Sequence, residues 1–147
     1  MFKNILIPTD GSDLAQRAAT QGVELAKALG AKVTAFYAAP PATPIIYRDH
    51  LPAGYATPAE HQEMIDELAA KHLAFVEQTA GKAGVPCETV RTVSDYPHED
   101  ILKVARDKSC DAIIMGSHGR SGLRGVFIGS VTQKVLNHAK IPVVVFH

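Results

Sequence analysis

The chain has 147 residues, with 15 basic and 15 acidic side chains and therefore no net charge at neutral pH. This length predicts one domain over residues 1–147 with a sizeable core. The balanced charge disfavours a broad nucleic-acid-binding surface, no apolar run is long enough for a membrane span, and the seven histidines show no metal-site spacing.

The first predicted element is a buried strand over residues 3–8, followed by the turn signal Thr9-Asp10-Gly11-Ser12. Its apolar residues fit a strand better than a secretory leader, so no leader is expected. Ser12 is a plausible N-cap for a helix that ends at Gly30. Small residues recur in this helix at helical spacing, which would let it lie close to a sheet. They are Ala15, Ala18, Ala19, Gly22 and Ala26, with Leu29 at the end.

A second strand is predicted over residues 32–38, which are rich in β-branched and aromatic side chains. The proline-rich stretch 39–55 is interpreted as a surface excursion, with a mobile flap beside a site as the alternative. A long amphipathic helix is predicted over 58–80, ended by Gly81 and Gly84. Its expected inner stripe is Ile65, Leu68, His72, Phe75, Val76 and Thr79. We interpret the histidine of this stripe as a packing residue rather than a ligand.

The second half of the chain continues the alternation of strands and helices. The predicted elements are a strand over 87–93, a helix from Pro97 with Ile101, Val104 and Ala105 inward, a strand over 112–115, a helix from Ser130 and a strand over 142–146. The pattern predicts an α/β fold with four helices on the two faces of a five-stranded parallel sheet. With strand order 3-2-1-4-5, ligands would bind where the order reverses, between the strands that end near Asp10 and Gly116.

Residues 116–129 form the most distinctive stretch, with five glycines in fourteen residues. The stretch precedes a helix in which Ser130 and Gln133 have capping-box spacing. Glycines let a backbone approach a ligand closely, and a helix N-terminus favours an anion. Arg120 and Arg124 would add charge-assisted bonds to phosphate. We therefore interpret the stretch as a phosphate-binding loop, with a merely flexible turn as the alternative.

The loop lacks both the Gly-Lys-Ser/Thr of a Walker A motif and the GxGxxG spacing. Its own spacing is Gly116-x-x-Gly119, nine residues, and then Gly129-Ser130. This spacing resembles the ATP-binding branch of the universal stress protein family. The resemblance covers the whole chain, through ILIPTDGS at 5–12, IMGSHG at 114–119, GSVT at 129–132 and IPVVV at 141–145. It implies a Rossmann-like, adenine nucleotide α-hydrolase-like three-layer sandwich.

The resemblance also implies a site for ATP, or for AMP or ADP, with Mg²⁺ held through the phosphates. The implied binding residues are Pro8, Thr9, Asp10, Ala38, Met115, Gly116, His118, Gly119, Arg120, Gly129, Ser130, Val131 and Thr132. Ala38 would contact adenine through its backbone, and Met115 would pack beneath the ligand as well as in the core. His118 would touch phosphate or simply be solvated. Asp10 has three open roles: contact with a nucleotide hydroxyl or base, acceptance of backbone N–H bonds in the turn with capping of the first helix, and metal or general-base chemistry.

Three functions are compatible with these features. A regulatory ATP-binding sensor in a stress response is favoured over a slow ATPase or phosphate-transferring enzyme, and an empty interaction scaffold ranks third. No paired carboxylates or nucleophile–base pair accompany the loop, so no catalytic residue is assigned. The last strand, Val143–Phe146, is expected to form a homodimer at the sheet edge, unless the chain's own helices cover it. Cys87 and Cys110 lie outside any CxxC motif, which is typical of a cytoplasmic protein.

Overall fold

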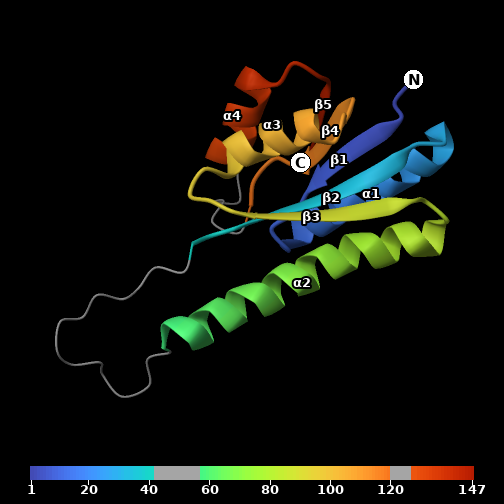
Figure 1. Cartoon of the computed structure of the whole chain (residues 1–147). Coiled ribbons are helices and arrows are strands. Elements are labelled where there is room, and N and C mark those ends of the chain that lie inside the picture. Colours follow the sequence, from blue (N-terminus) through green and yellow to red (C-terminus); the bar gives the residue numbers. More distant parts are fainter. Residues whose placement is uncertain (42–56, 120–126) are drawn as a thin grey trace.

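The computed structural model describes residues 1–41, 57–119 and 127–147 (Figure 1). Within these ranges strands and helices alternate along the chain. They are β1 (Asn4–Pro8), α1 (Asp13–Leu29), β2 (Lys32–Ala39), α2 (Pro58–Ala83), β3 (Cys87–Val93), α3 (Pro97–Asp107), β4 (Ala112–Gly116), α4 (Ser130–His138) and β5 (Val143–Phe146). The alternation confirms the predicted α/β fold.

All five strands lie parallel in one sheet with the order β3-β2-β1-β4-β5, as predicted. Ile5 of β1 lies between Val33 of β2 and Ala112 of β4, which sets the register of the sheet centre. The strand order reverses between β1 and β4. Their carboxyl ends therefore lie side by side, while the chain continues from β1 and from β4 to opposite faces of the sheet.

Two helices cover each face of the sheet, and Figure 1 shows α2 on one side with α3 and α4 on the other. Val23 of α1 and Val76 of α2 belong to the core of one face. Val104 of α3 and Val135 of α4 belong to the core of the other face. The molecule is therefore the predicted three-layer sandwich, with all strands of the sheet centre buried.

Local signals place α1 as the sequence predicts. The Ser12 hydroxyl accepts a hydrogen bond from the Ala15 N–H at 3.2 Å, and Gly30 ends the helix with a φ of 65°. Gly22 faces the sheet so closely that a Cβ there would lie 2.8 Å from Ile7 Cδ1. A small residue at this position therefore lets α1 pack tightly on β1.

The start of α2 contains a capping box that the sequence analysis did not identify. The Thr57 hydroxyl accepts from the Glu60 N–H at 3.2 Å, and the Glu60 carboxylate accepts from the Thr57 N–H at 2.6 Å. The second bond, from the Thr57 backbone, is the main cause of the lowered pKa of Glu60. Both N–H groups would otherwise lack an intrahelical partner.

The predicted end of α2 at residue 80 was wrong. The helix continues through Gly81 to Ala83, and Gly84 ends it with a φ of 72°. The buried stripe, which packs along α1 and β2, also differs from the predicted one. Its members are Ile65, Ala69, His72, Leu73, Val76 and Ala80, whereas Leu68, Phe75 and Thr79 are only partly buried.

The predicted capping box at the start of α4 was also wrong. Gly129 occupies the N-cap position, Ser130 is already helical, and no side chain caps this end among the described residues. The cause is a hydrogen bond from the Gly129 N–H to the Ser117 carbonyl at 2.7 Å, which fixes where the helix begins. Ser130 therefore lies one position too late to act as the cap.

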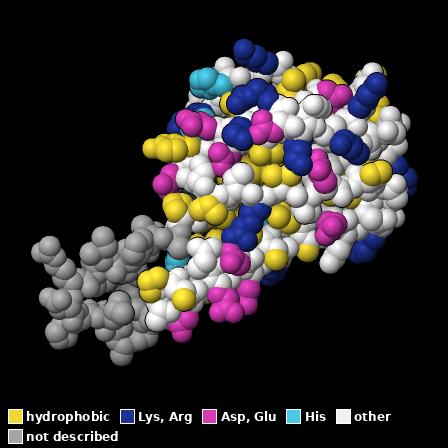
Figure 2. All heavy atoms as spheres, in the orientation of Figure 1, with side chains coloured by type: hydrophobic (Ala, Val, Ile, Leu, Met, Phe, Trp, Pro, Cys, Tyr) yellow, Lys and Arg dark blue, Asp and Glu magenta, His cyan; other side chains and the backbone are white. Residues whose placement is uncertain are grey.

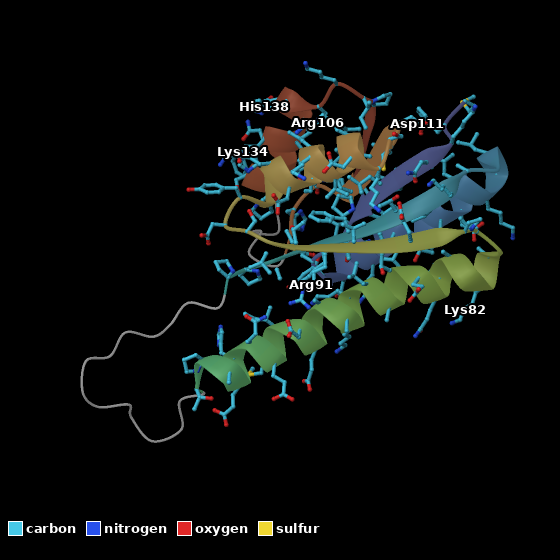
Figure 3. The ribbon with its side chains drawn as sticks, viewed as in Figure 1. Lys82, Arg91, Arg106, Asp111, Lys134 and His138 are labelled. Carbon is cyan, nitrogen blue, oxygen red and sulfur yellow. The ribbon has the colours of Figure 1, made fainter. Side chains whose placement is uncertain are left out.

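Asp111 anchors the end of the sheet where β4 begins (Figure 3). Its carboxylate accepts the N–H groups of Lys3 and Asn4 at 2.8 and 3.1 Å. These bonds hold the start of β1 against the start of β4. The carboxyl ends of β1 and β4 lie at the opposite edge of the sheet and take no part in this anchor. The proline-rich stretch interpreted as a surface excursion lies outside the described residues from position 42 onward.

One face of the molecule carries both signs of charge in close mixture. Figure 2 shows Lys and Arg side chains interspersed with Asp and Glu on the visible face. None of the helices in the described part of the chain combines the length and the apolarity needed to cross a bilayer.

Candidate functional site

The carboxyl ends of β1 and β4 bring the two predicted loops into direct contact. A Cβ at position 119 would overlap the Asp10 carboxylate, so any larger residue there would force the Asp10 side chain to move. The two residues are far apart in the sequence and meet only because β1 and β4 are neighbours in the sheet. The aspartate turn and the glycine loop therefore face each other, as the predicted strand order requires.

A cavity of about 430 Å³ opens at this point. Every predicted binding residue that the structure describes lines it. These residues are Pro8, Thr9, Asp10, Ala38, Met115, Gly116, His118, Gly119, Gly129, Ser130, Val131 and Thr132. Arg120, the remaining member of the predicted set, lies outside the described residues, as does Arg124.

Four further lining residues were not predicted: Ala15, Phe36, Pro97 and Ile101. Pro97 and Ile101 come from the first turns of α3, which packs over the carboxyl end of β2. Ile101 was predicted to face the core, and this inward face extends to the cavity wall. The amphipathic pattern of α3 was the available signal, although it does not separate core from cavity.

The cavity lining combines apolar side chains with backbone N–H groups. Phe36, Met115, Pro97 and Ile101 supply hydrophobic surface. The first turn of α4 also lines the cavity, and its N–H groups have no intrahelical partner. These donors and the positive end of the helix dipole favour an anion. The arrangement suits a ligand with a flat apolar part and a negatively charged part.

The turn after β1 is held by its own side chains. The Asp10 carboxylate accepts the Ser12 N–H at 3.0 Å, and the Thr9 hydroxyl accepts the Gly11 N–H at 3.2 Å. The Thr9 N–H also donates to the Phe36 carbonyl at 2.9 Å, which ties the turn to β2. Asp10 therefore accepts a backbone N–H of its turn, as one of its predicted roles requires, but Ser12 rather than Asp10 caps α1. The same carboxylate faces Gly119 through its other oxygen.

Gly11 rests on the buried side chain of His72. Gly11 has a φ of 77°, and a Cβ there would overlap the imidazole of His72. The His72 ring in turn packs edge-on against Tyr37, with 5.3 Å between ring centroids. His72 is thus the packing residue that the sequence predicts, and it supports the aspartate turn from the α2 side.

The turn after β4 is fixed through Ser117, which is 1% exposed. Its N–H donates to the Phe146 carbonyl of β5 at 2.7 Å, and its carbonyl accepts the Gly129 N–H at 2.7 Å. The Thr132 hydroxyl donates to the Gly116 carbonyl at 2.9 Å. These bonds join β4, β5 and the start of α4 into one rigid unit beside the cavity.

Ser117 also joins two histidines that the sequence analysis did not connect. Its hydroxyl lies 3.1 Å from Nδ1 of His118 and 2.8 Å from Nδ1 of His147. The two rings stand nearly perpendicular, with centroids 6.3 Å apart. His118 lines the cavity, whereas His147 lies on the other side of Ser117, against α1.

Neither cysteine belongs to the cavity, and neither is activated. Burial is the main cause that raises the pKa of both the Cys87 and the Cys110 thiol. Raised thiol pKa values disfavour the reactive thiolate. Within the described ranges, no group of three or more His, Cys, Asp or Glu side chains is placed to hold a metal ion.

Comparisons with known proteins place the chain among proteins of one kind. A family model described as "Universal stress protein family" matches residues 1–147. A universal stress protein of Methanocaldococcus jannaschii, MJ0531, is 33% identical over 150 residues, covering 99% of this chain and 82% of the relative. A second protein of that organism, universal stress protein MJ0577, is 32% identical over 155 residues, covering 99% and 94%.

Solved structures agree with these sequence matches. The structure of MJ0577 superposes with a TM-score of 0.77 at 28% identity, covering 99% of this chain and 95% of that one. A universal stress protein in complex with cAMP superposes with a TM-score of 0.71 at 25% identity, covering 99% and 97%. Sequence, fold and the glycine spacing agree, and the chain belongs to the universal stress protein family.

Proposed function

We propose that the protein binds ATP, or the related AMP or ADP, in the cavity between β1 and β4, and acts as a regulatory sensor in a stress response. The observation that carries the proposal is the contact of the Asp10 turn with Gly119 beside the first turn of α4. A family member solved with cAMP, an adenine nucleotide, supports this ligand class. The cavity volume of about 430 Å³ lies in the range of small-molecule sites.

In this proposal the adenine lies against the apolar side chains that line the cavity. The backbone of Ala38, at the end of β2, contacts the base, while Met115 packs beneath it. Pro97 and Ile101 close the other side of the base from α3. These contacts favour a flat ring but leave few polar groups, so base selectivity rests on the backbone.

The phosphates lie beside the first turn of α4. The backbone N–H groups of Gly119 and of the first turn of α4, with the Ser130 hydroxyl, donate to phosphate oxygens. Asp10 accepts a hydrogen bond from a ribose hydroxyl, since an ionised carboxylate is an acceptor only. Mg²⁺ is held through the phosphates and waters.

We further propose that the 147-residue chain acts as one nucleotide-binding domain in the cytoplasm and pairs with a second copy through β5. β5 is an edge strand, and Val144 on it is 36% exposed. Both cysteines are free thiols, which fits a reducing compartment.

A thermal-shift series tests the nucleotide proposal. ATP, ADP, AMP and cAMP should raise the melting temperature more than GTP, and ligand at one hundred times its dissociation constant adds about 2.7 kcal/mol of stability. Gly119→Val displaces the Asp10 carboxylate and crowds the loop, so this variant should lose the response. Gly81→Ala is the control, because a Cβ at Gly81 meets nothing within 4 Å.

Two results would count against this placement. Absence of any shift with adenine nucleotides would leave the interaction scaffold as the better description. An unchanged ATP response in the Gly119→Val variant would move the site away from this cavity.

A further inference from the structure

The hydroxyl of Ser117 lies between two imidazoles and connects the cavity with the opposite side of the sheet edge. It is within hydrogen-bond distance of Nδ1 of His118 and Nδ1 of His147. His118 lines the cavity of the candidate site beside Gly119 and Gly129. His147 lines a second hollow of about 580 Å³, on the α1 side of β5. The three side chains thus form one hydrogen-bonded chain that leads out of the site.

This chain of three side chains rests on a fixed backbone. The N–H and the carbonyl of Ser117 are both bonded at 2.7 Å, to Phe146 and to Gly129 respectively. Ser117 is almost fully buried, so its hydroxyl has few alternatives to the two imidazoles. His118 follows Ser117 directly and shares this anchor. The imidazole beside the proposed phosphate position therefore has Nδ1 bonded to Ser117 and packs edge-on against the His147 ring.

Proton counting restricts the tautomers of the two histidines. A hydroxyl has one proton, so it donates to one Nδ1 and accepts an N–H from the other. When Ser117 donates to His147, the Nδ1–H of His118 donates to Ser117. In that state the lone pair of His118 lies on Nε2, the nitrogen that acts as nucleophile or base.

We propose that His118 accepts a phosphoryl group from a bound nucleoside triphosphate. The inference rests on the proposed function, because it requires ATP in the cavity with its phosphates beside Gly119 and Gly129. It deepens that function by giving the nucleotide site a covalent reaction. His118 would be the catalytic residue, and Ser117 and His147 would be positioning residues.

The reaction balances without a further reactant. The Nε2 lone pair of His118 attacks the terminal phosphorus, and a nitrogen–phosphorus bond forms. The bond from that phosphorus to the bridging oxygen breaks, and the diphosphate leaves with the electron pair. The Nδ1 proton of His118 passes to the Ser117 hydroxyl while the hydroxyl proton passes to Nδ1 of His147. The products are a phosphohistidine, the nucleoside diphosphate and one proton held by His147.

Incubation with Mg²⁺ and ATP labelled in the terminal phosphate tests the inference on the full chain. The protein should gain a phosphoryl group that acid removes and base does not, and peptide mapping by mass spectrometry should locate it on His118. His118→Gln should abolish the label. His138→Gln is the matched control and should be labelled like the parent, since His138 lies at the exposed end of α4 (Figure 3), where its Nδ1 hydrogen-bonds to the Lys134 carbonyl of its own helix.

The positioning role of His147 has its own readout. His147→Ala removes the terminal proton acceptor, and labelling should slow by roughly 100-fold, the lower range for general acid–base catalysis. His147 is exposed, so imidazole added to the solution can reach the vacated position and should restore labelling. Restoration would not occur if the side chain served only to stabilise the fold.

The possible results distinguish phosphorylation of His118 from the nucleotide binding on which it rests. A protein that is stabilised by ATP but gains no label, or gains an acid-stable label on another residue, overturns the inference and leaves nucleotide binding intact. A protein that no adenine nucleotide stabilises overturns both. Loss of label in His138→Gln would also contradict the assignment to His118.

Discussion

At the scale of single residues, Gly11 shows how the fold supports the candidate site from behind. Its left-handed backbone conformation places the aspartate turn over the His72 imidazole, with no room for a side chain between them. A glycine in the turn signal was expected from the sequence. The reason for it was not, because His72 lies on a helix far along the chain.

Gly11→Ala should destabilise the protein by more than about 1 kcal/mol, the typical cost of a left-handed residue with a Cβ. Gly84→Ala isolates that conformational cost, since Gly84 has a similar φ of 72° and a Cβ there meets nothing within 4 Å. The loss for Gly11→Ala should therefore be the larger of the two in urea denaturation. If the two variants lose the same free energy of unfolding, the close contact between Gly11 and His72 does not contribute to stability.

At the scale of elements, some helix ends can be predicted from the sequence and others cannot. Ser12 and Gly30 bracket α1 as predicted, because both residues act on the nearest turn of backbone. Ser130 has the same type of motif but fails, because a hydrogen bond between Gly129 and Ser117 sets the start of α4. A long-range bond therefore overrides a local motif at the site itself.

Thr57→Ala should reduce stability by about 1 kcal/mol, the usual effect of losing a helix cap. The variant removes the bond to the Glu60 N–H and weakens the reciprocal bond from Glu60. Thr20→Ala is the matched control, because the Thr20 hydroxyl bonds back to the Gln16 carbonyl inside α1 and caps nothing. The control should be neutral or slightly stabilising in the same denaturation series. A larger loss for Thr20→Ala would contradict the assigned role of Thr57.

The predictable part of the structure follows from short-range patterns and from topology. Strand order alone brought Asp10 to Gly119, because loops at the carboxyl ends of neighbouring strands must meet. The link from Ser117 to His147 was not predictable in this way. It depends on Gly116 pairing with Phe146, and thus on the exact register of β4 and β5. Burial patterns do not fix such a register to one residue at a sheet edge.

The same limit applies to the walls of the cavity. Pro97 and Ile101 were predicted as the start and the inner face of α3, which is correct. Their contact with the cavity depends on how far α3 extends over the end of β2. That distance comes from packing between layers, which a hydrophobic pattern does not encode.

At the scale of the whole molecule, ion pairs between elements make stability depend on pH. Glu88 of β3 lies 3.1 Å from the Lys108 ammonium after α3 and also bonds to Thr34 of β2. The hydrogen bond from Lys108 is the main cause that lowers the pKa of Glu88. A bond from Arg91 of β3 is likewise the main cause that lowers the pKa of Asp66, and it links α2 to β3. A bond from Gln62, within α2, lowers that pKa further.

The protein should therefore lose stability in acid. A carboxyl group with a lowered folded-state pKa contributes stability above its unfolded pKa, about 4, and loses it as pH falls through the lower folded value. Urea midpoints should fall between about pH 5 and pH 3. Glu88→Gln should flatten this fall, and Glu24→Gln, at an exposed position on α1, should not. If the urea midpoint depends on pH in the same way in the parent and in Glu88→Gln, Glu88 does not cause the loss of stability in acid.

The proposed dimer is a property of the outer edge of β5. The Ile113 and Ser117 N–H groups donate to the carbonyls of Pro142 and Phe146, so the even-numbered residues of β5 turn their backbone toward β4. The N–H and carbonyl of Val143 and Val145 therefore face outward, where a second chain can add to the sheet.

Val145→Pro should convert a dimer of twice 15.7 kDa into a monomer, measured by sedimentation equilibrium. Proline removes one outward N–H without breaking the bonds between β4 and β5. Thr89→Pro is the matched control at the other edge: Val33 and Ser94 show that β3 turns its even-numbered residues toward β2, which leaves the Thr89 backbone outward. This control should remain dimeric. A parent protein that sediments at 15.7 kDa would exclude the dimer. A Val145→Pro variant that stays dimeric would show that the two copies meet at a surface other than β5.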